Sequence, residues 1–544
     1  MTRTLLVALL TVSAAPGADQ RLRPPLRADR DDQPITQPKT RHVSELYAIV
    51  HNTWLRHLSP EDKALRARDS GALNVNAWDD APDSSWFTNR AGQRPLPFKE
   101  IVSGLEGRPP APPPWQVLTI VREGYTPKLR VRDSAGRTYF VKFDLPTALE
   151  RNSAAERICT LIMHAAGYNV PYNTLAYFGA GDLSLDKDAS FEDATGKRRP
   201  MRPADLDDMF RSLKPLADGR YRGLASLLLP GKMVGRFVYT GRRADDPNDL
   251  IPHELRRELR GMRVIASWIN HVDVGDKNAM DAYNGDGRQF VKHYLIDFGS
   301  ALGSGDFVNG PYRVGHEYIF DGPAMGRAFV TLGAWRRPWE ANGRIRYPEV
   351  GYYQAELFDP PKWKPNYPNL AFERMDDADA YWGARIVTAF SDGLIDDLVK
   401  AGEYSRREVA AHLADVLKQR RDAIGRYWFD RITPLEDFAL RDGLLDFKDL
   451  AVERGYAGDG LPVYRYRVGD SKTGTEFRGP GLRLPELQPG NDVAPDRFGR
   501  KPLAGIRIQS RRRDGGWALP VEVILGRSGG GSALEVLGWR HAAR

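Results

Sequence analysis

Cysteine is nearly absent from the sequence, and so are metal-binding clusters and long apolar runs. Cys159 is the single cysteine among 544 residues, which excludes an internal disulfide framework. No Cys/His grouping has the spacing of a metal site. After the N-terminal residues, no run approaches the roughly 18 apolar residues that a spanning helix needs, so no later transmembrane segment is expected.

The composition is typical of folded globular chains. Hydrophobic residues make up 41%, aromatic residues 10% and charged residues 28%. The length exceeds one ordinary core, so we expect two or three folded units. The net charge is +8, and residues 497–544 hold ten Lys/Arg against three Asp/Glu. Such a tail suits nucleic acid, lipid headgroups or an acidic glycan, but we interpret it as the solvated face of a small β module, which argues against a nucleic-acid partner.

Residues 1–18 have the pattern of a signal peptide. Arg3 precedes an apolar stretch at residues 5–15, and small residues follow, although Pro16 interrupts the expected cleavage motif. We therefore expect export to the periplasm or the extracellular space. The alternative is a cytoplasmic protein, if this segment is not a signal peptide.

Hydrophobic periodicity divides the rest of the chain into four parts. Residues 19–114 form an N-terminal extension that begins with a proline-containing leader, expected to be flexible at 19–40, and ends in the linker GRPPAPPP. Residues 115–231 alternate short strands with one helix, residues 232–440 are mainly helical, and residues 441–544 return to strands. This order predicts an α+β protein with a C-terminal β-rich module.

The expected elements are as follows. Strands are predicted at 116–122, 128–132, 138–143, 173–178 and 221–229, with a charged insertion at 182–220 between the last two. Helices are predicted at 153–167, 252–270, 377–401 and 405–428. The last strands are predicted at 504–510, 519–525 and 533–539.

Two segments in the middle of the chain carry chemistry. Residues 271–278 read HVDVGDKN, and residues 295–299 read LIDFG, an apolar strand that ends in D-F-G. Phosphoryl transfer from ATP needs a carboxylate that orients the proton of the nucleophile, together with an amide and a second carboxylate that hold a metal ion on the phosphates. Asp273, Asn278 and Asp297 supply these groups in the right order.

On these motifs the chain resembles the protein-kinase superfamily. It is most similar to atypical branches, namely HipA-type, spore-coat and secretory-pathway kinases, and to uncharacterised exported bacterial kinase-like proteins that share VKFD, LPGK and NHxD segments. The resemblance covers residues 115–440. It implies a bilobal fold, with a β-rich N-lobe at 115–231 and a helical C-lobe at 232–440. It also implies Mg-ATP, or Mn-ATP, bound between the lobes, with Asp273 as the base and Asn278 and Asp297 as metal ligands.

The same resemblance implies a lysine on the third strand and a glutamate on the next helix. Lys142 and Glu156 have these positions. A lysine can reach phosphate oxygens as a compact charge, and the carboxylate holds it in place. Glu156 has a second interpretation, because Ser153-Ala-Ala-Glu156 is also a capping box that would use the carboxylate at the helix start. A start at Thr147-Ala-Leu-Glu150 would free Glu156 for Lys142, and we favour this one.

The chain departs from the kinase pattern in two places. The glycine-rich phosphate loop G-x-G-x-x-G is absent, and only Gly124, in REGYTPK at residues 122–128, lies between the first two strands. No A-P-E motif follows Asp297. By resemblance, Leu229 in LLLPG at the expected hinge lies against the adenine. These departures leave three hypotheses open: a phosphotransferase, a pseudokinase that binds or scaffolds, and an enzyme that transfers AMP. The acceptor can be a protein, a glycan or a small molecule.

A fusion of residues 1–40 to a reporter that is active only outside the cytoplasm tests the export prediction. We expect reporter activity, because the charged start and apolar stretch match an export signal. An inactive fusion, beside an active fusion to an established signal peptide, would contradict export.

Overall fold

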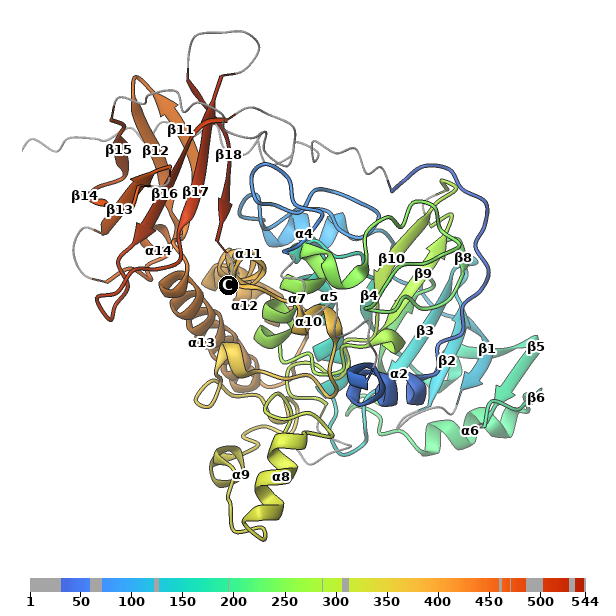
Figure 1. Cartoon of the computed structure of the whole chain (residues 1–544). Helices are drawn as coiled ribbons and strands as arrows, with labels where there is room; N and C mark the ends of the chain where they lie inside the picture. The colour runs from blue at the N-terminus through green and yellow to red at the C-terminus, as the bar shows by residue number, and fades with distance from the viewer. Residues whose placement is uncertain are drawn as a thin grey trace, which may run out of the picture.

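The computed structural model describes residues 31–58, 71–121, 127–193, 195–285, 287–305, 313–458, 462–469, 471–485, 502–527 and 534–542 (Figure 1). The expected signal peptide at 1–18 and Gly124 lie outside these residues. Within them, no helix is both long enough and apolar enough to cross a membrane. The fold is of mixed helix and strand composition, with several separate sheets.

A seven-stranded sheet forms the first large unit. Its strand order is β4-β7-β3-β2-β1-β5-β6. The strands are β1 (Trp115–Val121), β2 (Lys128–Arg132), β3 (Thr138–Phe143), β4 (Asn173–Phe178), β5 (Leu183–Glu192), β6 (Arg198–Pro200) and β7 (Tyr221–Leu227). The five strands predicted in this region are confirmed. The charged insertion also folds, because β5 extends the sheet parallel to β1 and α6 (Pro203–Arg211) packs Leu206, Met209 and Phe210 against it.

Helix α5 (Arg151–Ala166) lies between this sheet and the helical part of the chain. Almost all of its side chains are buried, and Gly167 ends it with a positive φ of 123°. Cys159 is buried in this helix and belongs to the hydrophobic core.

The central part is built from helices and one small sheet. The sheet has the order β10-β9-β8, and α7 and α11 pack closely against each other. The elements are β8 (Lys232–Met233), α7 (Arg257–Trp268), β9 (Ala279–Tyr283), β10 (Val291–Leu295), α8 (Gly322–Val330), α9 (Pro338–Asn342), α10 (Leu370–Glu373), α11 (Asp377–Thr388), α12 (Asp392–Lys400) and α13 (Arg407–Arg431).

The single helix predicted at 377–401 is wrong, because the structure divides it into α11 and α12. The apolar periodicity continues across the break, but Ser391 takes an extended conformation and its Oγ accepts a hydrogen bond from the N–H of Leu394 at 3.2 Å. Serine caps a helix start well, so a new helix begins at this residue and changes direction.

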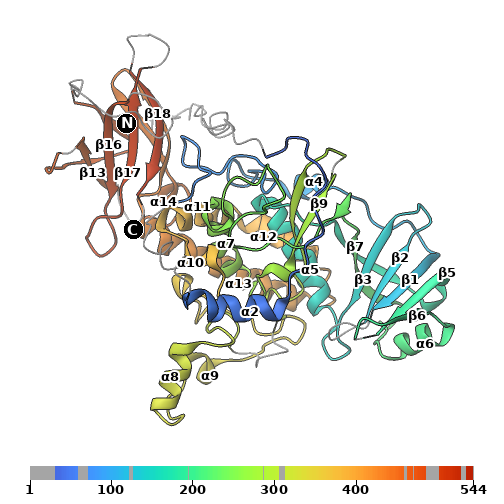
Figure 2. The same cartoon turned by 45° about the vertical axis from the view of Figure 1, so that its right-hand side comes forward.

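The C-terminal residues form a β-rich unit with two sheets, of order β11-β12-β15 and β14-β13-β16-β17-β18. The views from two directions show it beside the end of α13 (Figure 2). Its elements are β11 (Leu435–Arg441), β12 (Leu444–Asp449), α14 (Leu450–Glu453), β13 (Val463–Val468), β14 (Thr475–Arg478), β15 (Gly481–Arg483), β16 (Pro502–Ser510), β17 (Val521–Gly526) and β18 (Glu535–His541).

The N-terminal extension is more ordered than its sequence indicates. Its elements are α2 (Glu45–Thr53), the 3-10 turn η1 (Leu55–Leu58) and α4 (Phe98–Gly104). The part of the expected flexible leader that the structure describes is docked instead. The N–H of Ile35 donates to the carbonyl of Gln289 at 2.7 Å, and its carbonyl accepts from the Tyr283 hydroxyl at 2.9 Å. Trp78 and Trp86 are buried in different cores. These contacts are with residues far along the chain, so local composition does not predict them.

The stability of this fold should fall in acid through His164, in the last turn of α5. Burial lowers the pKa of this histidine to about 3, from an ordinary value of 6.5. Below pH 6.5 the unfolded chain therefore binds a proton that the folded chain does not accept until about pH 3. We expect the free energy of unfolding to decrease over this window by up to about 1.4 kcal/mol per pH unit for this one group. His164→Gln should flatten the decrease in urea titrations, and an unchanged slope would contradict the prediction.

Candidate active site

Lys142, Glu156 and Asp297 meet at one point, although they come from three distant segments. The Lys142 Nζ lies 2.9 Å from Glu156 Oε1, 3.0 Å from Glu156 Oε2 and 3.0 Å from Asp297 Oδ1. Lys142 is on β3, Glu156 is on α5, and Asp297 follows β10. The lysine thus joins the sheet to the helix and to the D-F-G segment.

The start of α5 decides between the two interpretations of Glu156. The helix begins at Arg151, so Glu156 lies in its second turn. The carboxylate of Asp144 accepts from the N–H groups of Glu150 and Ser153, at 3.0 and 2.8 Å, and from the Ser153 hydroxyl at 2.6 Å. Asp144 therefore satisfies the helix start, and Ser153 does not form a capping box. Glu156 is free of that task and pairs with Lys142.

The charges of Lys142 and its carboxylate partners raise the pKa of the lysine and lower the pKa of Asp297. Burial by itself disfavours the Lys142 ammonium, but the charges of Asp297 and Glu156 outweigh burial and raise its pKa above the ordinary value. The charge of Lys142 lowers the pKa of Asp297 to about 2. The site therefore holds a permanent ammonium and a permanent carboxylate at neutral pH.

The loop at residues 269–278 follows α7 and contains the other two predicted residues. The Asn278 Nδ2 donates to the carbonyl of Asp273 at 2.6 Å, and the Lys277 Nζ lies 3.2 Å from Asp273 Oδ2. Lys277 is half-buried and paired with Asp273, so it is not a freely solvated side chain. Burial raises the pKa of Asp273 despite the charge of Lys277.

Main-chain contacts bring the loop and the D-F-G segment together. The N–H of Ile296 donates to the carbonyl of Asn278 at 3.0 Å. Asp297 has a φ of 62°, a left-handed conformation that is costly for a residue with a Cβ atom. Phe298 is buried next to the ring of His271, with ring centroids 5.3 Å apart. His271 thus packs against the D-F-G segment.

Asn278 and Asp297 fit Mg²⁺ or Mn²⁺ better than a softer metal such as Zn²⁺ or Cu²⁺. Both offer oxygen atoms, and the Asn278 amide uses its nitrogen on Asp273, which leaves its oxygen available. Within the described residues, no group of three or more His, Cys, Asp or Glu side chains has metal-binding geometry. Mg²⁺ typically takes one or two protein oxygens and completes its shell with water and substrate phosphates. The donor set therefore suits Mg²⁺ that arrives with a nucleotide.

Other predicted positions lie around this site or away from it. Leu229 is half-buried in the loop between β7 and β8, at the expected hinge. Asp281, three residues after Asn278, is buried between Arg243, at 2.8 Å, and His293, at 2.7 Å. Lys128 faces Lys142 directly across the β2–β3 pair. Two like charges in this register repel each other unless anions lie nearby. This was not apparent from the sequence without the strand register.

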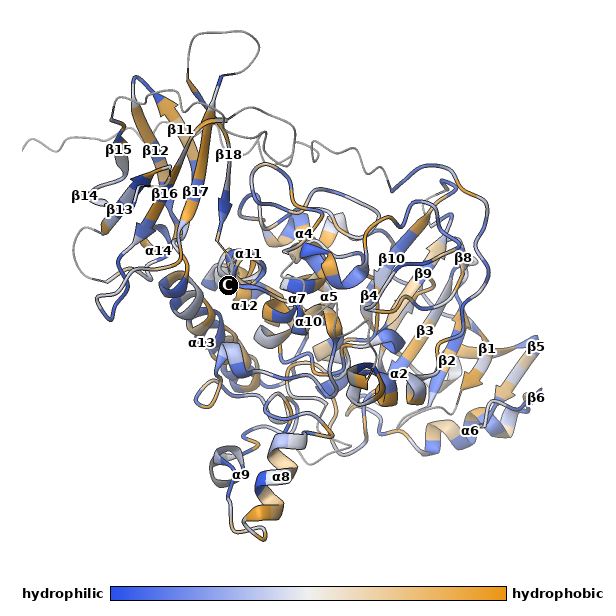
Figure 3. Ribbon diagram, in the orientation of Figure 1, coloured by the Kyte–Doolittle hydropathy of each residue, from blue (hydrophilic) through white to orange (hydrophobic). Residues whose placement is uncertain are grey.

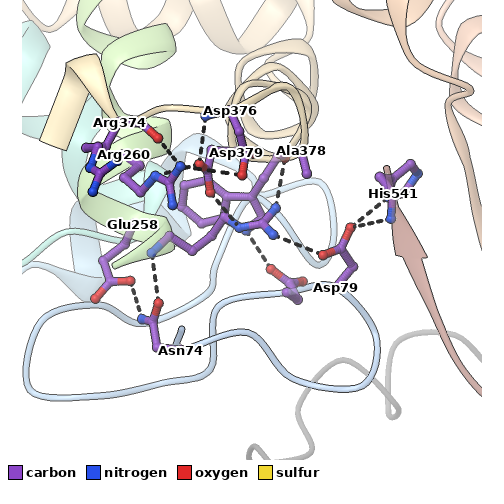
Figure 4. Close-up of polar contacts among 12 residues, drawn as sticks. Asn74, Asp79, Glu258, Arg260, Arg374, Asp376, Ala378, Asp379 and His541 are labelled. Carbon is purple, nitrogen blue, oxygen red and sulfur yellow. Dashed lines mark hydrogen bonds and ion pairs between the residues drawn. The ribbon is translucent and has the colours of Figure 1, made fainter. Parts of the chain in front are cut away.

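A buried ionic network surrounds α7, the helix that leads into the loop with Asp273 (Figure 4). The Arg257 guanidinium lies 3.0 Å from Asp79 Oδ1 and 3.0 Å from Asp379 Oδ1. Asp79 Oδ2 also contacts Nδ1 of His541, at 2.9 Å. Arg260 adds a contact to Asp379 Oδ2 at 2.7 Å. Sequence reasoning missed this network, because its members come from the N-terminal extension, two helices and the last strand.

A cavity of about 270 Å³ lies at the start of the loop that contains Asp273 and Asn278. Asn270, three residues before Asp273, lines it together with Trp363, whose Nε1 donates to Asn270 Oδ1 at 2.8 Å. Tyr352 and His316 line other parts of its wall. The wall of the cavity therefore includes a residue that is three positions from the predicted base in the sequence.

Comparisons with known proteins add little to this geometry. No protein-family pattern matches the chain, and no curated protein matches it. Among solved structures, a crystal structure of the Golgi casein kinase matches at 10% sequence identity, over 75% of this chain and 95% of that chain, with a TM-score of 0.28. The neighbour is a kinase, but a similarity at this score carries no argument, and the function must be argued from the site itself.

Breaking the Lys142–Glu156 pair should destabilise the protein. Glu156 is only 2% exposed, so Lys142→Met leaves its carboxylate buried next to Asp297 without a cation. Removing one partner of a buried pair costs about 3–5 kcal/mol. Adding Glu156→Gln to Lys142→Met should recover a large part of the loss in urea unfolding.

Lys400→Met is the matched control, because Lys400 pairs with Asp397 on the surface. We expect it to have little effect. Equal losses for Lys142→Met and Lys400→Met would show that the buried pair has no special role.

Proposed function

We propose that this protein is an ATP-dependent phosphotransferase with an atypical kinase-like, bilobal fold. Residues 115–231 are its N-lobe, residues 232–440 are its C-lobe, and the Mg-ATP or Mn-ATP site lies between them. The observation that carries the proposal is the meeting of Lys142, Glu156 and Asp297, with Asn278 tied to Asp273 alongside. These groups are the ones that phosphoryl transfer requires.

Each residue has a role that follows from its contacts. Lys142 presents a fixed positive charge to the nucleotide phosphates, and Glu156 holds it from the helix side. Asn278 and Asp297 would hold the metal ion, which when bound neutralises phosphate charge. Asp273 is held at its carbonyl by Asn278 and at its carboxylate by Lys277. Its raised pKa makes it a better proton acceptor than an ordinary aspartate.

Lys128 adds a third ammonium group to those of Lys142 and Lys277, around the carboxylates of the site. Lys128 lies close enough to act on the charges of Glu156 and Asp297. These two carboxylates already offset part of its repulsion from Lys142 across the strand pair, and a phosphate anion next to both lysines would offset more. A nucleotide triphosphate is an anion of the right kind. This favours nucleotide binding by the site, whichever acceptor it serves.

Thermal unfolding of the full chain with and without Mg-ATP tests the nucleotide site. We expect a rise in Tm, because a ligand at a hundred times its Kd stabilises the native state by about 2.7 kcal/mol. Asp297→Ala should abolish the rise, whereas Asp188→Ala, at a carboxylate that is 82% exposed, should keep it. No rise for the parent protein would contradict nucleotide binding.

Asp273→Asn separates binding from chemistry. We expect it to keep the Mg-ATP-dependent rise in Tm, because the carbonyl that accepts from Asn278 remains. ATP consumption should fall by about 10²–10⁴-fold, the usual contribution of a general base. A parent protein that binds Mg-ATP and consumes none with protein, glycan and small-molecule acceptors would instead be a binding module.

A further inference from the structure

Helix α8 and the turn that follows it expose large apolar side chains to solvent. Phe329 and Val330 are each 81% exposed, Leu332 is 93% exposed and Met325 is 56% exposed. Ala324 is the one buried residue of this nine-residue helix. A helix this short is not stable by its own hydrogen bonds and normally depends on burying one face. No other part of the described residues packs over its apolar face.

The base of this segment is firmly attached, so the exposure is not that of a loose end. The Asp321 carboxylate caps α8 at the N–H of Ala324, at 3.2 Å, and pairs with Lys364 at 2.5 Å. On the other side, Arg337 pairs with Glu317 at 2.8 Å. Both views show α8 and α9 projecting from the body, with apolar residues toward the far end of α8 (Figure 3). The projection holds its apolar tip, which consists of Met325, Phe329, Val330 and Leu332, away from the rest of the protein.

Arginine and tryptophan residues accompany the exposed apolar residues of this segment. Residues 322–346 contain five arginines and one acidic residue, Glu340. The side chain of Trp335 is stacked between two of these arginines, with Arg327 4.6 Å and Arg337 5.1 Å from its ring centroid. Arg336, Arg344 and Arg346 are exposed. Exposed apolar side chains, a tryptophan and several arginines are the groups that suit the acyl boundary, the headgroup level and the phosphates of a lipid bilayer.

We propose that the α8–α9 projection, residues 320–346, docks on the surface of an anionic lipid bilayer. The tip residues enter the boundary between headgroups and acyl chains, Trp335 lies at headgroup level, and the arginines pair with lipid phosphates. A second copy of the chain fits this surface poorly, because it would bring the same excess of positive charge. The proposal does not depend on the phosphotransferase assignment.

A dye on the tip reports whether the tip itself meets lipid. Leu332→Cys in the full chain can be labelled selectively with an environment-sensitive fluorophore, because Cys159 is fully buried. We expect a blue shift with vesicles of phosphatidylglycerol and phosphatidylcholine, a smaller one with phosphatidylcholine alone, and a loss of the shift at high salt. Val452→Cys, at a site 48% exposed in the C-terminal unit, is the matched control and should show no shift.

Changing the tip should release the protein from vesicles. Phe329→Glu combined with Val330→Glu should lower the fraction that sediments with anionic vesicles about tenfold or more, since two apolar anchors become charged. Leu250→Glu, at a surface leucine that is 49% exposed, should leave it unchanged. The apolar residues 5–15 and the basic tail are common to all these proteins, so they cannot produce a difference between them.

Three outcomes would overturn the proposal. The first is no blue shift at position 332 with anionic vesicles, and the second is an equal shift at position 452, which would show that another part of the chain binds lipid. The third is a shift at position 332 that grows with protein concentration in the absence of vesicles, which would identify a second copy as the occupant. Unchanged sedimentation of the Phe329→Glu, Val330→Glu protein, with an unaltered Tm, would also contradict it.

Discussion

The buried guanidinium of Arg257 is the constraint on which most of the architecture depends. A charge this deep is tolerable only where carboxylates meet it, and Asp79 and Asp379 do so from the N-terminal extension and from α11. Asp79 in turn holds His541 of the last strand. One ion cluster thus fixes the extension, the helical part and the C-terminal unit against α7. Because α7 leads directly into the loop with Asp273, the distant segments also set the position of the candidate site.

A second cluster of charges, around Lys142, also joins segments that are distant in the sequence. Its two carboxylates come from a helix and from the D-F-G segment, so a single ammonium group holds together a sheet, a helix and a loop. Asp297 adopts a left-handed backbone conformation there, and it also has the most depressed pKa of the site carboxylates. Strain of this kind persists only when the surroundings over-determine it, and it is common at functional sites. The candidate site therefore has the charge arrangement and the backbone strain expected where phosphate and metal would bind.

Local sequence patterns predicted most helices and strands, but they predicted the ends of these elements less well. The strands from β1 to β4 and β7, and the helix α5, follow from alternating or three- and four-residue apolar spacing, which depends only on neighbouring residues. The break at Ser391 was missed, because one side-chain hydrogen bond outweighs a continuous apolar period. The folded insertion with β5 was missed because a parallel strand pairs with a distant segment. The docked leader near Ile35 was missed for the same reason, since its partners lie some 250 residues away.

The sequence alone determined which residues are candidates for chemistry, since the spacing from Asp273 to Asn278 and the D-F-G at Asp297 are properties of the chain itself. It also determined that a lysine and a glutamate stand on consecutive elements. Only the tertiary structure decided that Glu156 pairs with Lys142 and leaves the helix start to Asp144. It likewise decided that Asp281 is held by Arg243 and His293. The reason is physical. The role of a carboxylate depends on the cation or N–H group that lies nearest to it, and folding brings that group from far along the chain.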